Sequence, residues 1–308
     1  MFTKFWDKLA EGLAGRWTVQ TLGPALAFWG GGILALVWHS GQSWQEITDR
    51  LETLDNTASY IALAVGGLLV LTTSSAVMTW LQLPALRLLE GYWPWQFRKL
   101  GFRLARHVEK RLQNKRDRWQ QLADIERQER TAEQQSEYAR LDAELAYYPV
   151  DQRHLMPTKL GNILRAAEEY PQMRYGLAMG VCWSRLWLVM SEGTQEALTQ
   201  ARQRLNSAVR LFVWGLLFAV WTAWAWWALL AAVVVALAAY WGMLQAAGIY
   251  GDLLRSAFDL HRFALYEQVR LPLPSTPADE EITGGRLSEY LFRGTGSDSA
   301  QFTDPTQK

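Results

Sequence analysis

The chain has 308 residues, half of them hydrophobic, and its formal net charge at pH 7 is +1. A total so close to neutral gives no support to nucleic-acid binding, which depends on an excess of Lys and Arg. The single cysteine, Cys182, excludes an intrachain disulfide and a multi-cysteine metal site. Many apolar residues lie in continuous runs rather than in amphipathic periods, so we expect much of the apolar surface to face lipid.

The first 21 residues have the pattern of an amphipathic helix. Apolar side chains such as Phe5 and Trp6 fall on one face, and Lys4, Lys8 and Arg16 fall on others. This pattern predicts an interfacial helix that lies on the membrane. No small-residue cleavage site follows the first apolar run, so we expect that run to stay in the protein as an anchor.

Residues 22–86 predict a first transmembrane hairpin, because they contain two uncharged runs, 22–38 and 58–86. Pro84 is expected to kink or end the second run. Small residues interrupt both runs, and in lipid they let neighbouring backbones approach closely. Alternatively, they could line a pore, since pores can be lined by small polar groups and backbone. These residues are Gly30, Gly31, Gly32, Thr72, Thr73, Ser74 and Ser75.

Charge is distributed very unevenly among the segments between the apolar runs. Residues 39–57 carry four acids and one Arg, whereas residues 87–210 carry about 21 Lys or Arg. Lys and Arg near membrane segments favour the cytoplasmic side. We therefore expect residues 87–210 to form a cytoplasmic helical insert, with both termini on the same side and residues 39–57 outside.

The insert begins with a basic amphipathic pattern. Residues 97–118 combine apolar residues at helical spacing with nine basic and two acidic residues. Such a helix can rest on anionic lipid, with about 1 kcal/mol contributed by each basic residue near the surface. A solvated face on an ordinary helix is the alternative. The residues expected at the membrane surface are Arg98, Lys99, Arg103, Arg106, Lys110 and Arg111.

The apolar pattern weakens through residues 126–137 and returns from Tyr138. This predicts two helices that pair in the cytoplasm, with Thr131 and Gln134 forming a capping box at the start of the second. A continuous coiled coil is the competing interpretation, and the weak middle disfavours it.

A further helix is predicted over residues 159–170, with Thr158 as its N-cap and Pro171 as its end. Basic residues gather around its N-terminus, where an anion is favoured by the helix dipole and by the side chains. They predict a site for a lipid headgroup, a phosphate or a nucleotide. The residues of this group are Arg153, His154, Lys159, Arg165 and Arg174.

The alternative is that these arginines pair with Asp151, Glu168 and Glu169 and hold the insert together. The same carboxylates are poor candidates for a catalytic pair, because adjacent residues on a helix point about 100° apart. The histidines are scattered singly, and the sequence contains no nucleophile elbow, phosphate-binding glycine loop or H-E-x-x-H motif. We therefore expect no catalytic residue, no metal and no cofactor.

Residues 177–190 form an apolar run that is too short to cross a membrane. We expect this run to be buried against the cytoplasmic mouth of the membrane domain, with Trp183 and Trp187 on one face. A re-entrant segment is the alternative. From Thr194 a helix is predicted to continue directly into the third crossing.

Residues 211–251 contain no charged residue over about 41 positions, which is too long for one crossing and suits two. They predict a second transmembrane hairpin that turns near residues 222–227, where several tryptophans would lie at the interface. Residues 252–293 are expected to form cytoplasmic C-terminal helices on either side of a proline-rich connector. The tail, residues 294–308, is predicted to be disordered.

Four stretches carry a recognisable combination of residues, at 155–169, 174–176, 182–187 and 250–263. Together they resemble a family of bacterial multi-pass membrane proteins without an assigned activity. The resemblance implies a location in the bacterial inner membrane. It supplies no catalytic residue, cofactor or partner.

Taken together, the sequence predicts an all-α integral membrane protein with four transmembrane helices in two hairpins and a cytoplasmic helical domain. The membrane segments contain no charged residue, which disfavours an ion-coupled transporter. We expect a non-enzymatic homo-oligomer that acts as a pore or as a scaffold, governed by the cytoplasmic domain and in contact with anionic lipid headgroups. The alternatives are a membrane-bound enzyme or sensor of phosphates at residues 153–174, and a lipid-regulated adaptor that uses residues 97–118.

Overall fold

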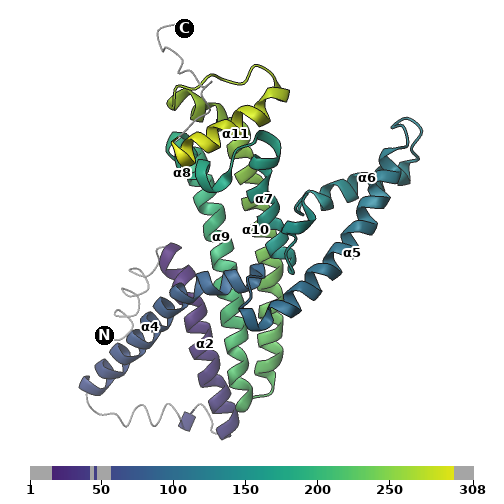
Figure 1. The fold of residues 1–308 in the computed structure, drawn as a ribbon. Coiled ribbons are helices and arrows are strands. Elements are labelled where there is room, and N and C mark those ends of the chain that lie inside the picture. The colour runs from purple at the N-terminus through teal and green to yellow at the C-terminus, as the bar shows by residue number, and fades with distance from the viewer. Residues whose placement is uncertain (1–15, 42–44, 47–56, 295–308) are drawn as a thin grey trace. The chain divides into compact units, whose positions relative to one another are not determined.

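The computed structural model describes residues 16–41, 45–46 and 57–294, and within these ranges it is helical without any strand (Figure 1). The helix expected over residues 1–21 and the expected tail therefore lie largely outside the described residues. In chain order the elements are α2 (Arg16–Ser40), α4 (Thr57–Glu90), η1 (Trp95–Phe97), α5 (Arg98–Ala123), α6 (Ala132–Leu145), η2 (Gln152–His154), α7 (Lys159–Tyr175), α8 (Met179–Val189), α9 (Glu192–Phe218), η3 (Ala219–Ala223), α10 (Trp227–Gln268) and α11 (Pro277–Arg293).

The predicted helical class is confirmed, and four helical stretches are long and apolar enough to cross a membrane. They are Leu22–Ser40, Ala58–Phe97, Glu192–Ala223 and Trp227–Gln268. Between 11% and 28% of the most apolar window of each is buried inside the protein. Most of this apolar surface therefore needs a solvent other than water, and a bilayer supplies one while helices satisfy their own backbone groups.

The chain divides into two compact units. Unit 1 contains residues 1–86 and 206–243, and unit 2 contains residues 87–205 and 244–308. Unit 1 thus holds most of the uncharged helical surface, and unit 2 holds most of the charged residues.

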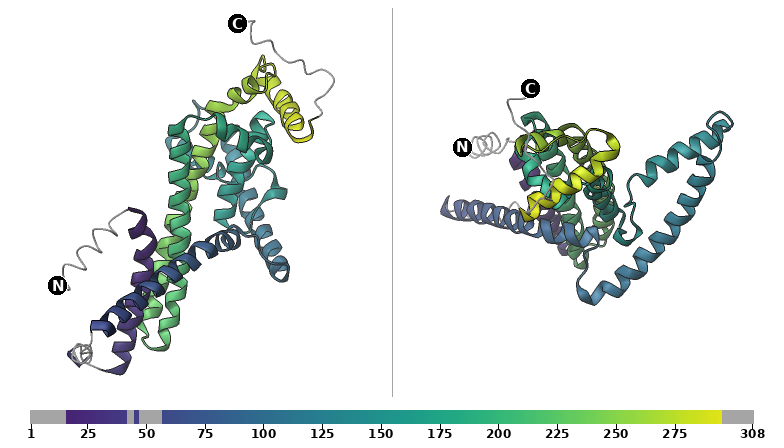
Figure 2. Two further views of the ribbon diagram at one scale, coloured as in Figure 1. Left: turned by 90° about the vertical axis from the view of Figure 1, so that its left-hand side faces the viewer. Right: turned by 45° about the horizontal axis from the view of Figure 1, so that its top comes forward.

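Unit 1 is held together by contacts between small and aromatic side chains. Ala25, Met78 and Trp214 form a buried cluster that joins α2, α4 and α9. On α9, a Cβ atom built at Gly215 would lie 3.0 Å from the Ala236 backbone nitrogen, so α9 and α10 approach closely there. Figures 1 and 2 show α4 crossing α2 obliquely, and the first half of α4 is mostly exposed.

Unit 2 has a core of its own, built from α7, α8, the first part of α9, α10 and α11. Phe258 and Tyr266 of α10 are fully buried in it. The short apolar run forms α8, which contributes to this core, and the rings of Trp183 and Trp187 lie 5.8 Å apart on it, as their spacing predicted.

A second part of unit 2 is the pair α5 and α6, which run side by side (Figures 1 and 2). The predicted capping box is confirmed: the Thr131 hydroxyl accepts from the Gln134 backbone, and the Gln134 side chain accepts from the Thr131 backbone. Trp119 and Tyr138 stack between the two helices with ring centroids 5.7 Å apart. The chain therefore forms two helices here rather than one continuous coiled coil.

Pro84 and Pro171 both lie inside helices. Of the two effects expected at Pro84, an end of the helix does not occur, because α4 continues to Glu90. The predicted end of α7 at Pro171 is wrong, because α7 continues to Tyr175 and ends at Gly176, whose φ is +68°. The Pro171 ring is buried, and burial offsets the lost backbone N–H bond, while the glycine provides the left-handed cap.

The last helix of unit 2 crosses the end of α7 at glycine. Gly284 of α11 is buried, and a Cβ atom built there would overlap the carbonyl oxygen of Tyr175. The next residue, Gly285, has open space around its Cβ position. The two adjacent glycines therefore differ in whether they allow a side chain.

We expect Gly284→Ala to destabilise the protein by about 1–3 kcal/mol, because the methyl group meets backbone that cannot rotate away. Gly285→Ala is the matched control. It should leave stability unchanged or raise it by up to about 1 kcal/mol through helix propensity. Thermal unfolding of both variants in detergent tests this, and equal melting temperatures would contradict the close crossing of α7 and α11.

Candidate functional site

The N-terminus of α7 is closed by its own neighbours in unit 2. Thr158 is the predicted N-cap: its hydroxyl accepts from the Gly161 nitrogen at 3.0 Å and donates to the Glu90 carbonyl at 2.9 Å. The side chain of Asn162, which is fully buried, bonds the backbone of Met156 and the Thr158 carbonyl. These bonds use groups that an anion would otherwise approach at a helix N-terminus.

Arg153 is occupied by a neighbouring carboxylate. Its guanidinium lies 2.7 Å from Asp151, and its backbone N–H also donates to that carboxylate at 2.9 Å. These hydrogen bonds lower the pKa of Asp151 to about 2. The pair is exposed to solvent, so it contributes to local geometry more than to stability.

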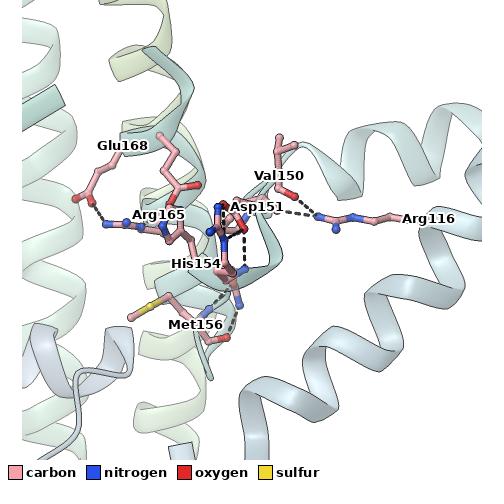
Figure 3. A network of polar contacts seen from close by, with 11 residues as sticks. Arg116, Val150, Asp151, His154, Met156, Arg165 and Glu168 are labelled. Atoms are coloured by element: carbon pink, nitrogen blue, oxygen red, sulfur yellow. Dashed lines mark hydrogen bonds and ion pairs between the residues drawn. The ribbon is translucent and has the colours of Figure 1, made fainter. Parts of the chain in front are cut away.

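His154 and Arg165 share a single carboxylate, that of Glu169. The His154 Nδ1 lies 2.7 Å from Glu169, and the Arg165 Nε donates to the same oxygen at 2.6 Å. Arg165 also lies 3.9 Å from Glu168 (Figure 3). Burial raises the pKa of Glu168, while Arg165 opposes this shift.

The two remaining members of the predicted anion-binding group lie at opposite ends of α7. Lys159 is at its first position, and no acceptor for its ammonium lies among the described residues. Arg174 lies in the last turn, with its guanidinium 5.7 Å from the Tyr170 ring and 5.8 Å from the Tyr175 ring. At about 1.5 Å per residue, the helix separates these two by about 22 Å. The five basic residues therefore do not converge, and three of them are paired with the carboxylates considered as the alternative.

Carboxylates of α6 neutralise the second half of α5. Lys115 pairs with Glu144, and Arg118 pairs with Glu137 at 2.8 Å. Arg116 donates to the carbonyl oxygens of Pro149 and Val150, which ties α5 to the segment before η2 (Figure 3).

The first half of α5 carries basic residues without such partners. Lys99, Arg103, Arg106 and Lys110 are all exposed, and none forms an ion pair with a described residue. Their spacing of four, three and four residues puts them on one side of the helix, and we call them the α5 basic stripe. Arg111 is exposed too, but about 100° away around the helix. Arg98 begins α5.

Large apolar side chains are exposed beside the stripe. Trp95 is 81% exposed, Phe97 55% and Phe102 61%, although aromatic side chains of this size are normally buried in a protein in water. Trp95 and Phe97 belong to η1, directly before α5, and Phe102 lies on α5. Exposed aromatic residues next to basic residues of a helix are typical of a segment that lies in a membrane interface.

In unit 1, Gly31 and Gly32 of the predicted packing or pore residues face aromatic rings. A Cβ built at Gly31 would overlap the Phe218 ring, and one built at Gly32 would overlap the Trp221 ring. Around Gly30 the space is open. The glycines therefore do not act alike, and two of them allow α2 to contact aromatic residues of α9 and η3.

Several hydroxyl groups of α4 donate to carbonyl groups of their own helix. Thr72 donates to the Leu68 carbonyl at 2.8 Å, and Ser74 donates to the Val70 carbonyl at 2.5 Å. Ser74 also accepts from the Trp29 indole at 3.3 Å, while Ser75 is buried. Thr73 and Ser74 line an open cleft in unit 1 with a volume of about 570 Å³, and most of its other lining side chains are apolar.

Sequence reasoning missed a set of polar contacts that join α7, α10 and α11. The hydroxyls of Tyr170 and Tyr175 both donate to Asp259, at 3.0 Å and 2.5 Å, and Arg262 pairs with the buried carboxylate of Glu280. Burial raises the pKa of both tyrosines. Because the partners are 84 and 89 residues apart for the tyrosines, no local spacing could reveal these bonds.

The described residues contain no cluster of three or more His, Cys, Asp or Glu that could hold a metal ion. Cys182 is fully buried, and its sulfur lies 3.7 Å from the Ser288 hydroxyl. Burial raises the pKa of this thiol, which disfavours the thiolate form that a nucleophile needs.

Comparison with family models, with curated proteins and with solved structures finds no match for this chain.

We expect Glu169→Gln to destabilise the protein by about 1–3 kcal/mol, because its carboxylate accepts charge-assisted bonds from His154 and Arg165. Glu168→Gln is the matched control on the adjacent residue. Its raised pKa means that the charged form is disfavoured in the folded state, so its neutral replacement should cost nothing at neutral pH. Thermal unfolding at pH 7.5 separates the two, and a larger loss in the Glu168 variant would contradict this assignment.

Proposed function

We propose that this chain is a non-enzymatic membrane scaffold. Its helices α5 and α6, with the loop between them, form an arm that lies on anionic lipid through the α5 basic stripe. The observation that carries this proposal is the contrast within α5. Basic residues of its second half are matched by acids of α6, whereas the stripe has no partner among the described residues and lies beside exposed aromatic side chains.

The placement in the membrane is part of the same proposal. Four crossings would form two hairpins, α2 with α4 and α9 with α10, in a bacterial inner membrane. The excess of Lys and Arg in residues 87–210 would keep that segment and both termini in the cytoplasm. The contact between Trp29 and Ser74 supports the first hairpin, and the approach of Gly215 to Ala236 supports the second.

Two other functions receive less support from the contacts. A pore needs polar groups that face its lumen, and Thr72 and Ser74 donate to carbonyl groups of their own helix. A phosphate-binding enzyme or sensor at residues 153–174 would need cations that converge, and Arg153 and Arg165 are each paired with a carboxylate.

The free energy expected for contact between the stripe and anionic lipid suits a reversible contact. Four basic residues at about 1 kcal/mol each would favour the membrane-bound arm by about 4 kcal/mol on a strongly anionic surface. Because α5 begins only eight residues after the end of α4, the arm is held near the membrane and loses little freedom on contact. The contact would weaken at high salt, since charges at a surface are screened within about 3 Å at 1 M. The fraction of anionic lipid would therefore determine the fraction of arms that are off the membrane and available to bind protein partners.

A fluorescent label on a cysteine at position 102 tests this contact. Phe102 is exposed on α5 beside the stripe, and the native thiol of Cys182 is fully buried. In liposomes that contain phosphatidylglycerol, the label on the full-length protein should emit at a shorter wavelength than in phosphatidylcholine alone. The double variant Arg103→Gln and Arg106→Gln should lose at least half of that shift.

The matched control is Arg127→Gln with Arg140→Gln, which removes the same charge from exposed positions elsewhere on the arm. This control should keep the full shift. A shift that is equal in both double variants, or that survives 1 M salt, would refute the stripe. The same cysteine reports orientation, because a membrane-impermeant thiol reagent should reach it in cells only after the inner membrane is opened.

The scaffold proposal also predicts tight membranes. Liposomes that contain the purified protein should release no trapped ions, with or without Thr73→Ala and Gly31→Ala, whereas a channel would show flux that these changes alter. Light scattering of the purified protein in detergent, with the mass of bound detergent subtracted, measures the mass of the assembly, which we expect to be a homo-oligomer. Selective ion flux would replace the scaffold by the pore.

A further inference from the structure

Arg210 of unit 1 is a cation without a counter-ion among the residues that the structure describes. It is the last charged residue before the uncharged stretch that ends at Asp252. Its guanidinium donates to the Gln82 side-chain oxygen at 3.2 Å and to the Ser207 hydroxyl at 3.0 Å, and both acceptors are neutral. No carboxylate pairs with it among the described residues. The side chain is partly buried, so it is shielded from water without being neutralised.

The apolar cleft of unit 1 begins one helical turn from this cation. Trp214 lies four residues beyond Arg210 on α9, and Leu81 directly precedes Gln82 on α4; both line the cleft. The cleft volume of about 570 Å³ lies within the usual range for small-molecule sites. A charged group and an apolar cleft are therefore adjacent in one unit of the fold.

The cleft offers little to a polar ligand. Ser74 and Trp29, two of its few polar lining residues, already bond each other, and Ser74 also bonds Val70. Lining side chains such as Val77 and Leu81 are about half exposed, at 52% and 44%. In a bilayer, such a surface must be covered by hydrocarbon.

We propose that Arg210 and this cleft together bind one phospholipid, with its phosphate on the guanidinium and an acyl chain in the cleft. An Arg guanidinium has five N–H donors, and the two bonds to Gln82 and Ser207 leave others for phosphate oxygens. The phosphate supplies the missing negative charge, and the chain covers the exposed apolar side chains. This site is distinct from the α5 basic stripe and goes beyond the scaffold proposal.

Charge favours a lipid over a second copy of the chain in this cleft. The uncharged runs 58–86 and 211–251 of another copy would cover the apolar lining but contain no acid to neutralise Arg210. A phospholipid provides both components in one molecule. Its phosphate also lies at the edge of the bilayer, where the charged residues that flank a membrane helix lie.

Native mass spectrometry of the full-length protein in detergent can count bound lipid. The probes are dioleoyl phosphatidylglycerol, dioleoylglycerol, which lacks the phosphate, and inorganic phosphate, which lacks the chains. We expect one tightly held phosphatidylglycerol per protomer and weak or no binding of the other two. Arg210→Gln should weaken this binding by about tenfold, the effect of losing one charge-assisted hydrogen bond.

Two pairs of variants make the test specific. The control for Arg210→Gln is Arg204→Gln, which changes an exposed arginine of the same helix and should bind lipid normally. In the second pair, Thr73→Trp fills the cleft, and its control Leu63→Trp adds the same ring elsewhere on α4. Thr73→Trp alone should abolish binding. Equal lipid counts in Arg210→Gln and Arg204→Gln, or equal binding of dioleoylglycerol, would overturn the proposal. So would a Thr73→Trp protein that dissociates into monomers with its lipid count unchanged, which would put a second copy in the cleft. The variant Arg103→Gln with Arg106→Gln should keep this lipid, which separates the site from the stripe.

Discussion

The structure depends on the exclusion of water from the hydrocarbon core of a membrane. Three of the four long apolar stretches have no Asp, Glu, Lys or Arg over the length of a crossing, and the remaining one, Glu192–Ala223, is uncharged only after Arg210. In lipid, their backbone groups must bond within their own helices. The side chains of α4 are compatible with the same constraint, because the hydroxyls of Thr72 and Ser74 donate to carbonyl groups of their own helix and need no water as acceptor. It also explains why charged residues gather in unit 2, where carboxylates and arginines can be matched.

Local patterns in the sequence predicted most of the helices, because the forces that start a helix act over a few residues. Thr131 and Gln134 cap α6 as their spacing predicts, and Thr158 caps α7. The end of α7 was missed because the energy of burying Pro171 comes from distant parts of the fold. The crossing at Gly284 and the bonds of Asp259 were not visible for the same reason: their partners are far away in the sequence.

The sequence predicts where basic residues cluster, but it does not predict which of them form ion pairs. The sequence identifies basic residues at 98–111 and 153–174 equally well, yet the structure treats them differently. Acids at positions 151, 168 and 169 lie within reach of the second group and pair with it, whereas the acids of α6 reach only as far as the second half of α5. The position of the acids, which depends on how the helices fold back, therefore decides which cations stay available to a ligand.

Arg210 shows the same principle inside the membrane unit. In the sequence it only marks where an uncharged stretch begins. Its partner Ser207 lies three residues before it on α9, whereas its partner Gln82 becomes known only when α4 and α9 are placed side by side. Both partners are neutral, so the protein orients this cation without cancelling its charge. The phospholipid that we propose would supply the two components that the described residues leave out, a negative group for this cation and hydrocarbon for the cleft. The lipid around a membrane protein can in this way complete a site that the folded chain only begins.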